Sequence, residues 1–308
     1  MEIDVIIPLY KPGKELFTLL DKLGSQSVPV HQVILLNTEE KYFEQLIYGI
    51  RFLETYQNIK VYHVSKKEFD HGGTRRMGVK KSSADVFVMM TQDAMPADRE
   101  LLAELLKALE QDENIAAAYA RQLPNAECSF VERYTRAFNY PDRSVVKTKK
   151  DMDQYGIKTF FCSNVCAAYK KDIYQKQGGF VRRTIFNEDM IYAGGLIQAG
   201  YGIAYAAEAK VIHSHNYNCM QQFHRNFDLG VSQAEHPEIF EGVPSEGEGM
   251  RLVKKTLSHL VRSGKIWLIP GFVMQCAGKY AGYLAGKNFR RLPKKFVLWC
   301  TMSPNYWK

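Results

Sequence analysis

The sequence has no low-complexity tract, no internal repeat and no linker rich in proline or serine. These absences exclude a disordered or repeat protein, and 46% hydrophobic residues in a chain of 308 can build one large core or two modest ones. The opening, MEIDVIIPLY, also lacks the basic start and long apolar segment of an export signal. We therefore expect a globular protein that stays in the cytoplasm.

Cysteine pairs at the spacing of zinc sites are missing as well. Disulfides are rare in the reducing cytosol, and cysteine is one of the residues most often found inside a protein core. We therefore interpret the six cysteines as buried free thiols: Cys128, Cys162, Cys166, Cys219, Cys276 and Cys300.

Acidic residues are absent from the last fifth of the chain. Residues 250–308 hold 12 of the 41 basic residues and no Asp or Glu, although the whole chain has a net charge of only +8. The rest of the sequence is slightly acidic. This asymmetry indicates a polyanionic partner for the C-terminal part, either a nucleic acid or an anionic membrane surface.

A long apolar run without charge is also lacking. The most apolar segment, 266–286, is interrupted by Pro270, Gln275 and Lys279, whereas a spanning helix needs about 20 predominantly apolar residues. The basic residues and Trp267, Trp299 around it are more typical of helices that lie in the membrane interface. The alternative is a soluble helical hairpin that packs on the rest of the protein.

The first half alternates between strand and helix patterns. Such alternation predicts an α/β fold with right-handed parallel crossovers and ligands at the carboxyl ends of the strands. Strands are expected at 3–10, 31–37, 59–65 and 85–91, and helices at 13–26, 40–56 and 74–82. The second half is less regular, and we expect the catalytic body to run unbroken to about residue 240.

An apolar run, VFVMMTQDAMP, ends abruptly at one carboxylate, Asp93. A carboxylate at a strand end suits a hard divalent cation, although it could equally cap a helix that starts near Pro96. The segment VIHSHNY carries His213 and His215, which would share one face of a strand. These histidines could complete a metal site begun by Asp93.

Two further segments could carry chemistry. In NEDM, Asn187 could cap a helix whose first turn holds Glu188 and Asp189, or one of the acids could be a general base. In EFDHGGTRRMG, the glycines at 72–73 before a helix start could offer backbone N–H groups to a diphosphate, with Arg75 adding charge. An ordinary turn is the alternative for this second segment.

Taken together, these motifs resemble the inverting GT-A enzymes of glycosyltransferase family 2. Several segments are similar to those of the bacterial branch that transfers rhamnose from dTDP-L-rhamnose: FDHGGTRRMG, TQDAMP, FFCSNVCAAYKKD, FNEDM and HSHNY. The resemblance covers about residues 3–230 and continues more loosely through 286–296. It implies a Rossmann-like, mostly parallel sheet flanked by helices over 1–245 and a basic helical extension over 246–308.

The resemblance also implies roles for individual residues. Asp93 would hold Mg²⁺ or Mn²⁺ with His213, or with His215 instead, and Asp189 would be the catalytic base. The donor would be bound by Pro8, Tyr10 and Asn37 around the thymidine and by Asp70, His71, Gly72, Arg75, Gln92 and Asp93 near the diphosphate. The acceptor and the donor sugar would be bordered by Ser163, Asn164 and Glu188.

The expected function is transfer of L-rhamnose, with inversion, to a lipid-linked saccharide in cell-surface polysaccharide synthesis. We expect the enzyme on the cytoplasmic face of an anionic membrane, as a monomer or a homo-oligomer. The chain departs from the family where it reads LLNTEE, with Asn37 after the second strand in place of the acid of many members, and where TQDA lacks the first acid of the D-x-D signature. Alternatives are another nucleotide sugar, a non-catalytic assembly partner, or a nucleic-acid-binding protein, for which no motif is present.

Overall fold

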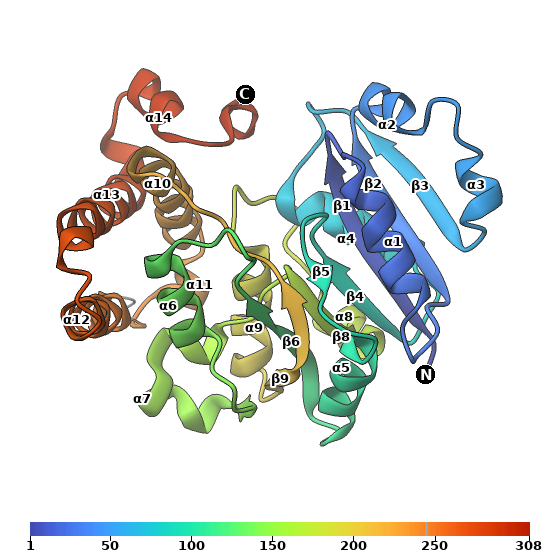
Figure 1. Cartoon of the computed structure of the whole chain (residues 1–308), viewed down its shortest axis with the longest axis horizontal. Helices are drawn as coiled ribbons and strands as arrows, with labels where there is room; N and C mark the ends of the chain where they lie inside the picture. The colour runs from blue at the N-terminus through green and yellow to red at the C-terminus, as the bar shows by residue number, and fades with distance from the viewer. Residues whose placement is uncertain (244–245) are drawn as a thin grey trace.

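A computed structural model describes residues 1–243 and 246–308 (Figure 1). The strands are β1 Ile3–Tyr10, β2 Gln32–Thr38, β3 Ile59–Val64, β4 Val86–Met90, β5 Met95–Pro96, β6 Ile115–Leu123, β7 Val145–Lys147, β8 Cys166–Lys170 and β9 Gly202–Ile212. The helices are α1 Glu15–Gly24, α2 Glu40–Ile47, α3 Phe52–Thr55, α4 His71–Lys81, α5 Leu101–Glu110, α6 Phe130–Asn139, α7 Met152–Tyr155, α8 Lys171–Lys176, α9 Glu188–Gln198, α10 Cys219–Glu235, α11 Pro237–Phe240, α12 Glu246–Arg262, α13 Ile269–Lys287 and α14 Lys294–Cys300.

The described strands form one mixed sheet in the order β3-β2-β1-β4-β8-β6-β9-β5, with β7 paired to β9. The first four strands along the chain are parallel, as the alternating pattern predicts. Strand β8 then runs antiparallel between β4 and β6, while β6 and β9 are parallel again. The carboxyl ends of β1, β2 and β4 therefore meet at one edge of the sheet, as expected for a ligand site.

The position of strand β4 inside the sheet explains why its sequence is apolar throughout. Its five residues are fully buried. Val86, Val88 and Met90 pack on one face of the sheet with helices α1 and α5, and Phe87 and Met89 pack on the other face with an aromatic cluster. Because the strand is covered on both faces, only its carboxyl end reaches the surface. The residues that follow this end, Gln92 and Asp93, are therefore presented at the edge.

Helices α10 and α13 pack closely along their length. The glycines Gly278, Gly282 and Gly286 recur every four residues on α13 and face the backbone of α10. A Cβ atom at Gly282 would lie 2.1 Å from the carbonyl oxygen of Phe223, and one at Gly286 would lie 2.1 Å from that of Phe227. The C-terminal extension is therefore docked on α10. Glycine allows the two backbones to approach this closely.

Over residues 1–243 and 246–308, no helix combines the length and the apolar character needed to cross a membrane. The expected boundary at 245 falls in residues 244–245, which lie outside the described part. The outer surface of the extension exposes large apolar side chains: Ile266, Trp267, Val273, Met274, Tyr280, Leu284, Phe296 and Trp299.

The glycine contact predicts a position-specific effect on stability. Replacing Gly282 by alanine would force the two backbones apart, and overpacking of this kind costs about 1–3 kcal/mol. We expect Gly282→Ala to lower the free energy of unfolding in urea by this amount. Gly271→Ala is the matched control, because it lies on the same helix and a Cβ there meets no atom within 4 Å. Equal stability of the two variants would contradict the packing described here.

Candidate active site

Three polar groups lie at the carboxyl edge of the sheet, and the first joins β1 to β4. The Gln92 side chain accepts a hydrogen bond from the Tyr10 backbone N–H (2.9 Å) and donates one to the Tyr10 carbonyl oxygen (3.2 Å). Both hydrogen-bonding groups of Gln92 thus hold the end of β1. Gln92 therefore positions Tyr10, and the donor contact expected of Gln92 from the sequence stays a prediction.

The second group is a candidate metal site. The Nε2 atoms of His213 and His215 lie 3.4 and 3.1 Å from one Asp93 carboxylate oxygen, and ligand atoms of the three residues lie within 4.8 Å of one another. The sequence therefore predicted this grouping correctly. It placed the histidines on a strand, however, and that is wrong: β9 ends at Ile212, so both histidines lie in the loop that follows.

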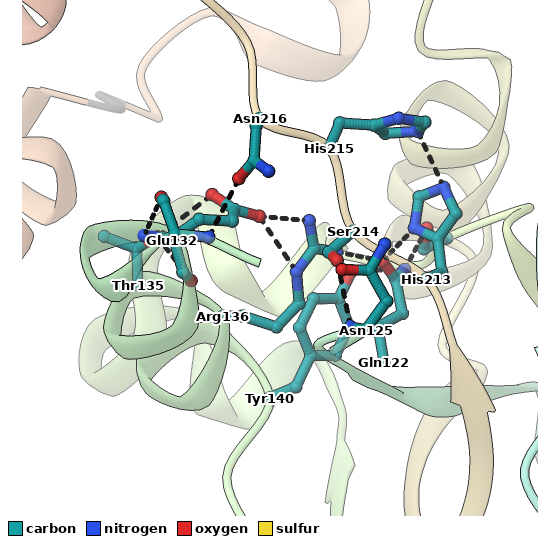
Figure 2. A network of polar contacts seen from close by, with 12 residues as sticks. Gln122, Asn125, Glu132, Thr135, Arg136, Tyr140, His213, Ser214, His215 and Asn216 are labelled. Atoms are coloured by element: carbon teal, nitrogen blue, oxygen red, sulfur yellow. Dashed lines mark hydrogen bonds and ion pairs between the residues drawn. The ribbon is translucent and has the colours of Figure 1, made fainter. Parts of the chain in front are cut away.

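A hydrogen-bond network behind His213 fixes the state of its ring (Figure 2). The Gln122 side-chain oxygen accepts from the Arg136 guanidinium, which can only donate, and lies 3.0 Å from His213 Nδ1. Nδ1 therefore carries the proton of the neutral ring, and the Nε2 lone pair of His213 faces both the Asp93 carboxylate oxygen at 3.4 Å and His215 Nε2 at 3.0 Å. A proton on His215 Nε2 or a cation can lie between these electron-rich atoms, because His215 Nε2 is within 3.1 Å of both.

This arrangement fits a divalent cation. Carboxylate oxygen and neutral imidazole nitrogen are both established metal ligands. The hydrogen bond from His213 to Gln122 is the kind of contact that orients a ligating histidine. Asp93, His213 and His215 could therefore hold Mg²⁺ or Mn²⁺.

The third group surrounds Asp189. This residue lies in the first turn of α9, and its carboxylate accepts hydrogen bonds from the backbone N–H groups of Asn164 (2.9 Å) and Met190 (2.8 Å). Burial, together with the negative charge of Glu188, raises the pKa of Asp189 above the ordinary carboxyl range. Asn187 precedes the helix in a left-handed conformation (φ 69°), and its side chain makes no capping hydrogen bond. The motif therefore fixes a carboxylate whose pKa suits a base.

Glu188 forms a buried ion pair with Arg75. The Arg75 Nε atom lies 3.0 Å from Glu188 Oε1, the two side chains are only 9% and 6% exposed, and Asn164 donates to the same oxygen at 3.0 Å. Burial alone would raise the pKa of Glu188, but Arg75 and its other partners lower it. Arg75 also donates to the His71 carbonyl oxygen. The pair occupies Arg75 Nε and Glu188 Oε1, and the expected roles of Arg75 at the diphosphate and of Glu188 at the substrate stay predictions.

The glycines of the HGGT segment have a structural explanation. Helix α4 begins at His71, so Gly72 and Gly73 lie inside its first turn, and the expectation of a helix start at Thr74 was wrong. Their N–H groups donate to the Asp70 carboxylate at 2.9 and 2.8 Å. A Cβ at Gly72 would lie 2.2 Å from the Val181 carbonyl oxygen. These N–H groups are therefore occupied, and Asp70 acts as the helix cap.

Several residues predicted to bind the donor border one cavity of about 370 Å³, which lies beside the Asp70 cap. Tyr10, Asp70 and His71 line it, together with Thr38, Lys66, Phe69, Thr184 and Ile185 and the C-terminal residues 302–306. Burial lowers the pKa of His71 to about 4, so this ring is neutral. The cavity size is within the usual range for small-ligand sites.

Asn37 and Pro8 were also predicted to bind the donor. Thr38 lines the cavity instead of either residue, and Pro8 lies within β1. Asn37 is fully buried and donates to the Glu39 carbonyl oxygen at 3.1 Å, but its own side-chain oxygen has no partner among the described residues. The Thr38 hydroxyl is likewise buried without a partner in the described part of the chain.

The groups are connected through residues 163–164. Gln122 donates to the Ser163 hydroxyl (3.1 Å) and to the Tyr140 hydroxyl (2.6 Å), and the neighbouring Asn164 holds Asp189. Ser163 and Asn164 thus support the metal group and the candidate base, and their expected contact with the sugars stays a prediction. Sequence reasoning missed Gln122, although it lies next to the end of an apolar strand in YARQLP, as Asp93 follows one in VFVMMTQD.

An α/β sheet with a candidate metal group and a fixed carboxylate at its carboxyl edge has the arrangement of an α/β enzyme whose ligands bind at the strand ends. The family described as Glycosyl transferase family 2 matches residues 4–178. The chain belongs to this glycosyltransferase family, and the predicted resemblance is confirmed.

Two relatives match over most of their length. The chain is 37% identical to the O-antigen chain rhamnosyltransferase RfbN of Salmonella typhimurium over 311 residues, which is 100% of this chain and 96% of the relative. It is 40% identical to the O-antigen chain rhamnosyltransferase WbaN of Salmonella anatum over 257 residues, covering 82% and 80% of the two chains.

Solved structures share the fold. The mannosyltransferase PcManGT from Pyrobaculum calidifontis, in complex with GDP-Man and Mn²⁺, has a TM-score of 0.57 at 16% identity and covers 99% of this chain and 85% of its own. TarS of S. aureus (residues 1–349) has a TM-score of 0.54 at 12% identity and covers 94% and 92%. The expected GT-A fold is therefore confirmed, with a mixed sheet.

The buried ion pair predicts a large effect of a small substitution. Glu188→Gln keeps the shape but leaves the Arg75 charge buried without its partner, and such changes cost about 3–5 kcal/mol. We expect this loss in the free energy of unfolding. Glu54→Gln is the matched control, because Glu54 pairs with Arg51 at the surface with its side chain 70% exposed, and such pairs contribute little. If Glu188→Gln left the free energy of unfolding unchanged, the ion pair would not be what holds α4 and α9 together.

Proposed function

We propose that this protein transfers L-rhamnose from dTDP-L-rhamnose to a saccharide acceptor in polysaccharide synthesis, with inversion at the sugar. The rhamnosyl donor is supported by the two relatives, both named O-antigen chain rhamnosyltransferases. The reaction type rests on one observation, the Asp189 carboxylate held by two backbone N–H groups in surroundings that raise its pKa. A fixed carboxylate of raised basicity suits a general base.

Asp189 would act on the acceptor. Its carboxylate takes the proton from an acceptor hydroxyl while that oxygen bonds to the anomeric carbon and the bond to the nucleoside diphosphate breaks on the opposite face. The proton ends on Asp189, and the electron pair of the broken bond leaves with the diphosphate. A divalent cation held by Asp93, His213 and His215 would offset the charge on this leaving group.

The acceptor would lie on the side of the metal group where His215 borders a second groove. A groove of about 350 Å³ begins at His215 and runs between α6 and α13. Its lining offers the indole ring of Trp267 and the polar side chains of Gln275 and Lys279, with Glu132 on the opposite wall. Aromatic faces beside hydrogen-bonding groups match the surface of a sugar, which has apolar and hydroxyl-bearing sides. We assign this groove to the acceptor saccharide.

The reaction can be tested with a panel of nucleotide sugars. We expect nucleoside diphosphate release from dTDP-L-rhamnose in the presence of acceptor, with Mg²⁺ or Mn²⁺ required and EDTA inhibitory. Asp189→Asn should lower turnover by at least about 100-fold, the range of general-base effects, and leave binding of dTDP unchanged. The matched control Asp153→Asn changes an exposed carboxylate and should retain wild-type turnover.

The pH dependence gives a second readout of the same assignment. The base must be unprotonated, so kcat/KM should fall as the pH drops through the raised pKa of Asp189. The acid limb should therefore lie above the ordinary carboxyl range, well above pH 4. A limb near pH 4, or full turnover by Asp189→Asn, would contradict the role of Asp189 as the base.

We also propose that the C-terminal extension binds the cytoplasmic face of an anionic membrane, where a lipid-linked acceptor would be found. Support comes from its exposed apolar side chains, among them Trp267 and Trp299, and from the absence of acidic residues over 250–308. Interfacial helices combine such apolar surface with basic residues. The acceptor groove opens on the same extension, because Trp267 lines it.

Liposome flotation tests this attachment. Each basic residue near anionic lipid contributes about 1 kcal/mol, so Lys294→Glu with Lys295→Glu should weaken binding to anionic vesicles at low salt, with little effect on neutral vesicles. High salt should release the wild type only partly, since the apolar contacts remain. The control pair, Lys149→Glu with Lys150→Glu, is equally exposed but lies on the catalytic body. Identical flotation of both double variants would argue against the extension as the attachment surface.

A further inference from the structure

The last residues of the chain return from α14 toward the N-terminal half. In Figure 1 the C-terminus lies between α14 and the first strands. Residues 302–306 form one wall of the cavity of about 370 Å³, and Tyr10, Thr38 and Lys66 lie on the opposite side. The two walls come from opposite ends of the sequence.

This C-terminal wall is anchored on α10. The Asp228 carboxylate accepts hydrogen bonds from the Thr301 hydroxyl (2.6 Å) and the Met302 N–H (3.0 Å), and the Tyr306 hydroxyl donates to Glu235 (2.8 Å). Asp228 is buried, so the bonds that it accepts are shielded from water. The segment is thus fixed at both of its ends to one helix.

Other contacts bridge the cavity to the catalytic body. Arg183 donates to the Tyr306 carbonyl oxygen at 2.6 Å and lies over the Tyr306 ring, and the Asn305 side chain is 3.4 Å from the Lys66 carbonyl oxygen. These contacts hold residues 302–306 at a defined distance from the ends of β1 and β2. The cavity between residues 302–306 and the ends of β1 and β2 is therefore defined by specific contacts of the fold.

The cavity offers what a nucleoside diphosphate would need. Thr38 borders it, and the buried Thr38 hydroxyl directly behind this wall has no partner in the described residues. The Lys66 ammonium group, 3.3 Å from the Tyr10 hydroxyl, supplies positive charge. Met302, Pro304 and Tyr306 add apolar surface. The positive charge suits the diphosphate of such a ligand. The polar and apolar groups suit its base and sugar, which have both hydrogen-bonding edges and apolar faces.

We propose that residues 302–306 form part of the binding site for the nucleoside of the donor, so that the C-terminus completes a site begun by β1 and β2. This inference rests on the proposed function, because it assumes a nucleoside diphosphate donor. It assigns the end of the basic extension to substrate binding, in addition to any contact with a membrane.

Oxidative footprinting of the full chain tests the contact directly. Met302 is 52% exposed and lines the cavity, whereas Met250 on α12 is 56% exposed and lies outside its lining. With saturating dTDP and Mn²⁺, we expect hydrogen peroxide to oxidise Met302 at least threefold more slowly and Met250 at an unchanged rate. An unchanged rate at Met302, under conditions where dTDP is bound, would overturn the proposal.

Shortened and substituted chains provide the second test. A chain ending at Thr301 should bind dTDP at least 10-fold more weakly by calorimetry, and a chain lacking only Lys308 should bind normally. If the shorter chain unfolds, Pro304→Gly with Asn305→Ala should weaken dTDP binding in a folded protein. Unchanged affinity in a folded variant overturns this inference alone. Failure of the intact chain to bind any of dTDP, UDP and GDP overturns the proposed function together with it.

Discussion

The ion pair between Arg75 and Glu188 is the contact on which the arrangement of the site depends. It joins α4, which follows the third parallel strand, to α9 in the second half of the chain. Burying two charges gives little net stability, but neither charge can remain inside without the other. The pair therefore fixes the relative position of the two helices. Asp189 follows Glu188 directly, so the candidate base is placed by the same contact.

The charges of this pair also set the chemistry of Asp189. Burial and the Glu188 carboxylate raise its pKa, and the Arg75 guanidinium opposes that rise. Asn164 holds both acids at once, through its side chain on Glu188 and its backbone N–H on Asp189. One acid thus stays charged and paired while its neighbour becomes a stronger base. Two adjacent carboxylates can have different roles because their partners differ.

Local sequence rules predicted the parts of the site that depend on one strand end each. The apolar strand β4 had to expose whatever followed it, so Asp93 could be identified, and the end of β9 placed His213 and His215 at the same edge although both lie in the loop beyond it. The Arg75–Glu188 pair joins residues 113 positions apart, and no local pattern reports such a contact. The same holds for Gln122, which bonds His213, and for residues 302–306, which face Tyr10. The glycines at 72–73 suggested an anion site, because a pair of adjacent glycines at a helix start is typical both of such sites and of close backbone packing.

Helix α10 links the remaining functions of the extension. Its backbone receives the glycines of α13, and its acidic side chains Asp228 and Glu235 anchor residues 301–306. Any displacement of α13 from α10 would therefore disturb the frame on which the cavity wall is built. The exposed apolar surface of the extension and the proposed acceptor groove both involve α13. The cavity wall formed by residues 302–306 is anchored on α10. The close packing that only glycine permits thus fixes the proposed acceptor groove relative to the proposed donor cavity.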